Sequence, residues 1–224
     1  MDWQAITLTL KLATVVCVSL LLIGIPLAYW LTFSRWRWKF LVESVVALPL
    51  ILPPTVLGFY VLVAIGARSP VGQAWTDWFG RGLAFSFEGL VIGSMLYSLP
   101  FAVQPMTAAF SQVDPVLIEA SSILGASRLR TFARVIAPLS VNGILTGAIL
   151  SFAHTIGEFG MVVMVGGNLP GVTRTVSIAI YDDVQALRYG SANATALLLL
   201  VFSFAVLAVV YALNRRIWAA QPEL

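Results

Sequence analysis

Long apolar segments alternate with shorter polar ones along the whole chain. Each apolar segment is about 18 residues or longer with few charges, the length that a helix needs to cross a bilayer. Only helices or closed barrels satisfy every backbone group there, and these segments are too long for barrel strands. The pattern therefore predicts an all-α, polytopic integral membrane protein, with about five transmembrane helices in a single domain, residues 1–224. The expected spans are residues 8–33, 41–65, 89–110, 139–165 and 192–213.

Composition agrees with this class. Of the 224 residues, 59% are hydrophobic and 10% are charged, whereas soluble domains carry about 25% charged residues. The formal net charge is +3. In a membrane protein such an excess is expected in cytoplasmic loops, so we expect membrane lipid and no nucleic acid as a partner.

The basic residues also orient the spans, because Lys and Arg are concentrated in cytoplasmic loops. The expected spans put eight basic residues on one side, and put the others on the opposite side among several acidic residues. The distribution predicts an N-terminus outside and a C-terminus in the cytoplasm. The eight residues are Arg35, Arg37, Lys39, Arg128, Arg130, Arg134, Arg215 and Arg216.

Two segments on the predicted outer side are long, residues 66–88 and 166–190. The first contains Trp75, Trp78 and Phe79, which fit either an amphipathic piece at the membrane interface or a plain belt of aromatic residues. The belt is the simpler interpretation.

Prolines and glycines interrupt two of the expected spans. Pro53 and Pro54 remove backbone donors from the second span, and Gly157 and Gly160 interrupt the fourth. Such breaks are tolerated at membrane depth where the backbone is buried in protein or lines a cavity. These four residues are therefore candidates for the lining of a pathway or for purely structural breaks.

His154 and Glu158 are four residues apart in the fourth span, on one face if the helix is regular. Ionisable groups at membrane depth usually face a bundle interior or water. The two side chains are candidates for a pathway site, or for an ion pair or caps at the end of the span. One His and one carboxylate are too few ligands for a metal, so we expect no metal site. With a single His and a single Cys, no nucleophile–base constellation can be assembled, and an intramembrane enzyme is only a remote alternative.

A polar loop, residues 111–138, separates the third and fourth spans. Asp114 and Pro115 form a typical helix start, and apolar residues follow at helical spacing. Gly125 would end this short amphipathic helix in a left-handed turn. A second helical piece, residues 128–135, leads to Pro138. From these features alone, an ordinary amphipathic helix on the membrane surface is an equal alternative.

The loop resembles the cytoplasmic coupling loop of ABC importer permeases. The matching residues are Glu119, Ala120, Gly125, Val135 and Pro138, while Ser121 and Ala137 depart from the preferred Ala and Leu but remain small or apolar. The resemblance implies a type I ABC importer permease fold and docking of a separate cytoplasmic ATPase. It also implies that Glu119, Ala120, Ser121, Gly125 and Pro138 are the coupling residues. No phosphate-cradling Gly-rich loop occurs in this chain, so ATP hydrolysis would belong to that partner.

Four further motifs lie outside the loop: LPPTVLGFY at 52–60, GEFG at 157–160, GNLPG at 167–171 and TRTVSIAIY at 173–181. They are similar to motifs of oxyanion importer permeases, and most similar to those of molybdate ABC transporter permease subunits. The resemblance implies import of molybdate, together with tungstate, across a bacterial or archaeal cytoplasmic (inner) membrane. The implied partners are two ATPase subunits, an extracytoplasmic molybdate-binding protein and a second copy of the chain, with no cofactor. A sulfate or thiosulfate permease, in which two different chains pair, is the main alternative; a secondary transporter would leave the coupling-like loop without a role.

Overall fold

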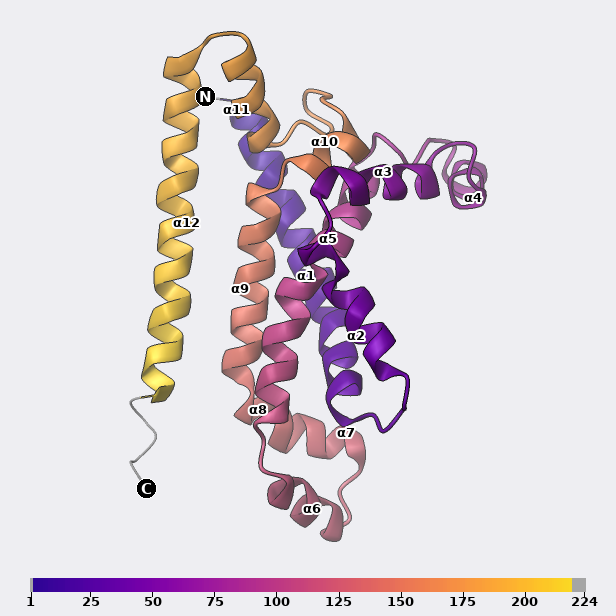
Figure 1. Cartoon of the computed structure of the whole chain (residues 1–224), viewed down its shortest axis with the longest axis vertical. Helices are drawn as coiled ribbons and strands as arrows, with labels where there is room; N and C mark the ends of the chain where they lie inside the picture. Colours follow the sequence, from indigo (N-terminus) through magenta and orange to yellow (C-terminus); the bar gives the residue numbers. More distant parts are fainter. Residues whose placement is uncertain (1, 219–224) are drawn as a thin grey trace.

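A computed structural model describes residues 2–218, with side chains through residue 212 (Figure 1). Every regular element in this range is helical, as predicted. Three long helices form the central bundle: α1 (Trp3–Phe33), α5 (Phe87–Ser111) and α9 (Val141–Gly157). Arg215, Arg216 and Trp218 lie beyond the described side chains. The main core of the bundle includes Leu12, Val16, Leu20, Ala28, Val103, Met106 and Phe110.

Small residues bring α5 and α9 into close contact. A Cβ atom built on Gly147 would lie 2.5 Å from the carbonyl oxygen of Ala102, and one on Gly143 would lie 2.3 Å from the Cβ atom of Ala109. The two glycines are four residues apart, so they share one face of α9 and let the backbones approach. This face of α9 therefore has no room for a side chain.

The second span is broken at the predicted prolines. It consists of α2 (Lys39–Ala47), a 3-10 turn η1 (Leu48–Leu50) and α3 (Pro54–Ile65). Pro53 is extended, with φ −54° and ψ 135°, and the two halves meet at 114°. Pro54 occupies the first turn of α3, where a missing N–H is tolerated. As a result α3 runs across the bundle, and α4 (Pro70–Phe79) projects beyond it (Figure 1).

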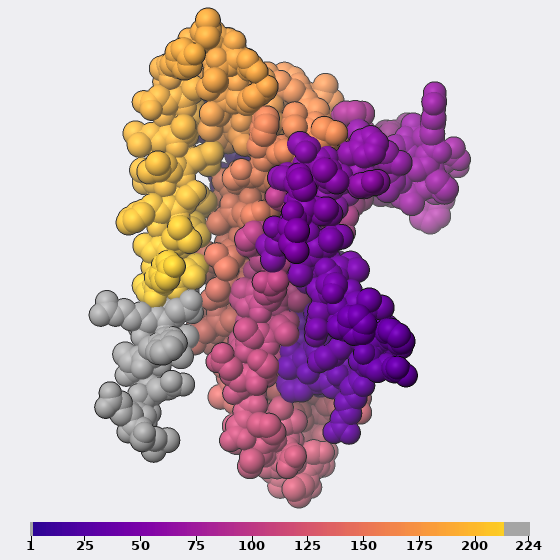
Figure 2. Space-filling view, viewed as in Figure 1, coloured from indigo at the N-terminus to yellow at the C-terminus, as the bar shows by residue number. Residues whose placement is uncertain are grey.

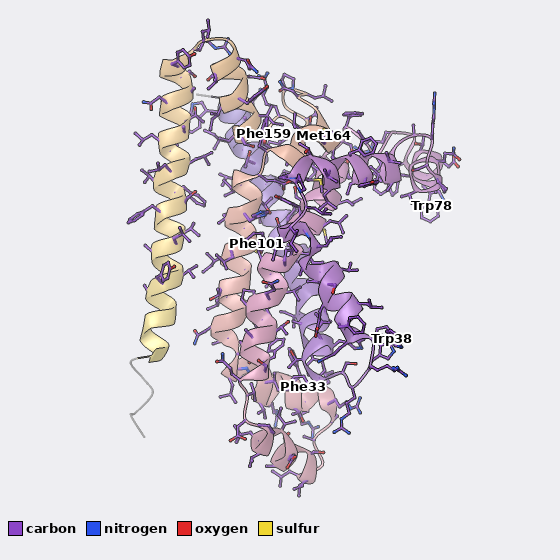
Figure 3. All side chains as sticks on the ribbon, in the orientation of Figure 1. Phe33, Trp38, Trp78, Phe101, Phe159 and Met164 are labelled. Carbon is purple, nitrogen blue, oxygen red and sulfur yellow. The ribbon has the colours of Figure 1, made fainter. Side chains whose placement is uncertain are left out.

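The fourth span is interrupted at the predicted glycines. The helix α9 ends at Gly157, and after Glu158 and Phe159 the chain resumes as α10 (Gly160–Gly166). The short helix α10 packs on α3 without room for side chains: Cβ atoms on Gly58 and Gly160 would lie 2.8 Å from Met164 Cβ and Pro54 Cβ, respectively. Phe159 and Met164 mark this contact in Figure 3. The second pieces of the two broken spans, α3 and α10, therefore form one block.

The remaining elements complete the spans. A loop after α10 leads to α11 (Val176–Gln185), and α12 (Tyr189–Trp218) returns toward the opposite end of the bundle (Figure 1). Three helices, α1, α5 and α12, are long and apolar enough to cross a membrane, and the two bent pairs bring the number to at most five, in line with the prediction. Only 11% of the apolar window of α12 is buried, against 50% for α5, so α12 touches the bundle along its edge (Figure 2).

The aromatic segment, residues 66–88, contains a discrete helix, α4. Ser69 caps α4 by accepting a hydrogen bond from the Gly72 N–H, and the rings of Trp75 and Phe79 stack with centroids 4.2 Å apart. Trp78 is 84% exposed on this projection (Figure 3). An amphipathic piece therefore forms here, although the belt was the simpler interpretation of the sequence.

At the opposite end, the polar loop folds into four short pieces (Figure 1). These are α6 (Pro115–Ile123), α7 (Arg128–Thr131), a π-helical turn η2 (Phe132–Ile136) and α8 (Ala137–Leu139). The chain bends by 74° between the α7–α8 segment and α9. Both predicted helical pieces are present, and the second contains a π turn that the sequence did not indicate.

The close contact of α5 and α9 leads to a test. We expect Gly147→Ala to destabilise the protein by about 1–3 kcal/mol, because the added methyl group overlaps the Ala102 carbonyl. The measurement is the thermal unfolding midpoint of the purified protein in detergent. Gly190→Ala is the control, since a Cβ atom there meets nothing within 4 Å, and we expect it to be neutral or stabilising. Equal midpoints for the two variants would contradict the packing described.

Candidate functional site

The loop of residues 111–138 has well-defined helix caps at both ends of α6. Asp114 accepts a hydrogen bond from the Val116 N–H at 2.9 Å, as its position before Pro115 predicted. At the other end Gly125 has φ +75°, the left-handed turn expected there. The N–H groups of Gly125 and Ala126 donate to the carbonyls of Ser122 and Ser121, the two bonds of a Schellman motif. The tip of the loop is thus locally determined.

The tip presents apolar side chains to the exterior. No residue of α6 is buried. Ile123, Leu124 and Leu129 are 86%, 85% and 77% exposed, and they lie around the turn at Gly125. Figure 2 shows this part of the chain as the narrow end of the molecule. A patch of this kind, away from the membrane-spanning helices, is typical of a surface that another protein covers.

Ser121, one of the departures from the family pattern, has a structural role. Its hydroxyl group lies 2.9 Å from the hydroxyl group of Thr131, which is buried at the end of α7. Ser127 caps α7 by accepting a bond from the Arg130 N–H. An Ala at residue 121 could not make the link to Thr131, so this chain connects the two helical pieces through a bond that the preferred residue does not provide.

Glu119 borders a cavity of about 800 Å³ between the loop and the end of α1. Arg35 and Arg128 also line this cavity. Glu119 is exposed and makes no salt bridge with any described residue. Its carboxylate is therefore available to a basic group of a partner.

A ring that the sequence did not single out joins the loop to the bundle. Phe132, in the π turn, lies edge-on against Tyr29 of α1 and Phe110 of α5, with ring centroids 5.4 and 5.9 Å apart. Ser140 donates a hydrogen bond to the Ala109 carbonyl of α5 at 3.3 Å, just where α9 begins. The loop is thereby in direct contact with α1 and α5 at the point where α9 begins. Pro138, in α8, is exposed beside this junction.

A second cavity, of about 470 Å³, lies where the two broken spans meet. It brings together five of the six candidate pathway residues. Pro53 immediately precedes the cavity lining, which consists of Pro54, Tyr97, Ala153, His154, Gly157, Glu158, Phe159 and Gly160.

His154 is held by contacts with α5. Its ring stacks on Phe101 with centroids 3.9 Å apart, and its Nδ1 atom lies 3.0 Å from the hydroxyl group of Ser98. Phe101 is labelled in Figure 3 on the middle of α5. Neither Ser98 nor Phe101 was a candidate from the sequence, although a Ser inside an apolar span is a usable signal.

Glu158 does not pair with His154, so the ion pair suggested by their spacing is wrong. Gly157 ends α9, and the extended backbone of Glu158 turns its side chain out of the helical register. The side chain is only 5% exposed, and both carboxyl oxygens lack a hydrogen-bond partner among the described residues. Ser94 of α5 is its neighbour, but the two side chains do not complete a hydrogen bond. Glu158 is therefore a buried polar group with unmet bonding capacity.

The loop after α10 is organised by Arg174. This side chain donates to Asn168 at 2.7 Å and to Asp182 at 2.6 Å, and it lies 3.7 Å from Asp2 at the start of α1. At the next turn, hydrogen bonds from Ser191 and Arg188 hold the pKa of Asp183 below its ordinary value. Residues 2–212 contain no group of three His, Cys, Asp or Glu side chains that could hold a metal.

Comparison with known sequences defines the class of protein. The chain belongs to the family described as binding-protein-dependent transport system inner membrane component, which it matches over residues 21–219. It is thus a multi-pass permease subunit of the inner membrane and not itself an enzyme.

Individual relatives are more specific. The molybdenum transport system permease protein ModB of Azotobacter vinelandii is 49% identical, over 96% of this chain and 95% of the relative. The protein of the same name from Escherichia coli K12 is 39% identical over 82% of this chain and 80% of the relative. The probable sulfate transport system permease protein cysT of Zygnema circumcarinatum is 33% identical over 91% of this chain and 69% of the relative.

Solved structures place the fold among ABC importers. A bacterial ABC transporter that imports alginate matches with a TM-score of 0.73 at 18% identity, over 96% of this chain and 79% of that chain. The inward-facing MetNI methionine ABC transporter matches with a TM-score of 0.73 at 17% identity, over 99% of this chain and 97% of that chain. At these identities the likeness concerns the fold, which is the one that the resemblance implied.

The turn at Gly125 provides a second test. We expect Gly125→Val to open the end of α6, because a β-branched residue opposes a left-handed backbone at a cost of about 1–2 kcal/mol. Hydrogen exchange of peptides covering residues 115–131 should then accelerate. Gly125→Asn is the matched control, since Asn tolerates this conformation. Unchanged exchange in the Val variant would show that the turn does not need glycine.

Proposed function

We propose that this chain is the permease of a molybdate importer, working as a single transmembrane domain that pairs with a second copy of itself. The observation that supports molybdate as the substrate is the 49% identity to a molybdenum permease over nearly the full length of both chains. The sulfate alternative has the weaker support, at 33% identity over a smaller share of the relative.

In this proposal the loop of residues 111–138 docks the cytoplasmic ATPase. The exposed apolar residues Ile123, Leu124 and Leu129 would enter a groove of the ATPase, and Glu119 would pair with a basic group beside it. Phe132 would pass the movement of the loop to α1 and α5. The excess of basic residues near this loop supports a cytoplasmic position for it, with the N-terminus on the outer side.

The outer segments would receive the anion from a molybdate-binding protein. The loop after α10, which contains Arg174, and the projecting helix α4 lie toward the end of the molecule opposite α6 (Figure 1). ATP binding and hydrolysis would shift the paired permeases between outward-open and inward-open states, because the nucleotide-bound ATPases favour one of them. The second copy is supported by the large apolar side chains left exposed on α3 and on the turn before it, such as Ile51 and Tyr60.

The substrate assignment is tested by reconstitution. The permease, its ATPase and its binding protein are placed in vesicles, and ATP-dependent uptake of molybdate is measured with tungstate or sulfate as competitor. We expect strong competition by tungstate and little by sulfate. Inhibition by sulfate alone would indicate that the chain is a sulfate permease instead.

The docking role of Glu119 is tested by charge reversal. We expect Glu119→Lys to abolish ATP-driven uptake while the protein still inserts, because it places a cation against a basic surface. Co-purification of the ATPase and uptake in vesicles are the measurements. Glu43→Lys is the control, since Glu43 is also exposed but lies on α2, outside the loop. Normal uptake and normal co-purification in Glu119→Lys would disprove the docking role.

A further inference from the structure

The cavity at the broken spans has an unusual backbone environment. Two interruptions, at Pro53 and at Glu158–Phe159, flank it at the same level of the bundle. Non-helical backbone at membrane depth is tolerated where it is buried in protein or lines a water-filled space. A Cβ atom added to Gly157, which lines the cavity, would meet nothing within 4 Å. The cavity thus has room for a solute.

Hydrogen-bond accounting fixes the tautomer of His154. The Thr155 hydroxyl donates to the Ser151 carbonyl at 2.8 Å, so its oxygen accepts from Ser98 at 3.0 Å. That contact uses the only hydroxyl hydrogen of Ser98. The third contact, 3.0 Å between Ser98 Oγ and His154 Nδ1, is then satisfied only if Nδ1 carries a hydrogen and donates it. No other assignment satisfies all three contacts.

The consequence concerns the other ring nitrogen. Nε2 of His154 has no partner among the described residues, and in the neutral ring it carries a lone pair. A lone pair repels an oxyanion, whereas an imidazolium would donate a charge-assisted hydrogen bond from Nε2. An imidazolium without a counter-ion is costly in a partly buried site. A dianion in the cavity and a proton on Nε2 therefore stabilise each other.

Building on the importer function proposed above, we propose that this cavity is a transit site for a tetrahedral oxyanion, which His154 binds as an imidazolium through Nε2. Ser98 is a positioning residue that holds Nδ1. The proton comes from water on the side where the anion enters and leaves with the anion. Each transit event at this site thus takes up and releases one proton.

The other groups around the ring are compatible with an anion. The titratable side chains lining the cavity with His154 are Tyr97 of α5 and Glu158 at the α9–α10 break, while α3 and α10 contribute only Pro54 and Gly160. Ser177 of α11 contacts the Glu158 backbone carbonyl. An ionised carboxylate without a partner is disfavoured by burial, so the neutral acid is the favoured form of Glu158. It adds no negative charge to repel the anion.

The single histidine of this chain allows a direct test. The permease is labelled with 15N-histidine, assembled with unlabelled ATPase and binding protein in lipid, and examined by solid-state NMR. In chloride we expect a neutral ring protonated at Nδ1. Saturating sodium molybdate at equal ionic strength should protonate Nε2 as well. A ring protonated at Nε2 alone, or one unchanged by molybdate, would overturn the proposal.

Two substitutions separate the roles of the ring nitrogens. His154→Gln brings an amide N–H near the Nε2 position, so we expect uptake to persist and to stay flat between about pH 6 and pH 8, where wild-type uptake falls several-fold as the proton becomes scarce. His154→Asn can keep the contact with Ser98 but has no donor at Nε2. We expect its uptake rate to fall at least tenfold, because one hydrogen-bond donor to the anion is lost.

Controls distinguish this inference from the proposed function. Co-purified ATPase and a single gel-filtration peak show whether each variant is folded. If both variants match wild type in rate and pH profile, the transit site is wrong although the importer stands. If the wild-type assembly itself shows no ATP-driven molybdate uptake, the proposed function fails first.

Discussion

Backbone polar groups find no water in the hydrocarbon of a membrane, and this constraint decides where the helices of this chain can be interrupted. The two interrupted spans do not break independently. Pro54, which follows the extended Pro53, lines the same cavity as the extended Glu158. The short helices α3 and α10 pack closely at Gly58 and Gly160, where there is no room for a further side chain. Each break is covered by the other span, and the cavity with His154 lies at the junction.

The helix α9 connects the two regions of interest. It begins at Val141, immediately after the loop with the exposed apolar tip, and ends at Gly157, in the wall of the cavity. Its 17 residues span about 25 Å as a rigid rod. Gly143 and Gly147 bring it into close contact with α5. The helix would thus connect the docking surface proposed at one end with the transit site proposed at the other.

Local signals in the sequence predicted local structure well. The start of α6 at Asp114 and Pro115, its end at Gly125 and the interruptions at Pro53 and Gly157 each depend on the conformational preferences of one or two residues. Other features depend on contacts between distant segments, which no local pattern encodes. They are the 114° bend, the pairing of α3 with α10 and the packing of the Phe132 ring against α1 and α5. The expected pairing of His154 with Glu158 failed for a local reason, because the helix ends between them. The candidate substrate came from resemblance, since the residues that line the cavity do not distinguish one tetrahedral oxyanion from another.

The bond between Ser121 and Thr131 has a consequence for how the proposed docking surface could change in evolution. The loop is tied to itself by that bond, by its own caps and by the turn at Gly125, so contacts within the chain account for its shape. Selection can then alter Ile123, Leu124 and Leu129 one at a time without unfolding the element that presents them. A loop built in this way can follow the drift of a partner's groove, or be grafted onto a related permease, as a self-contained unit.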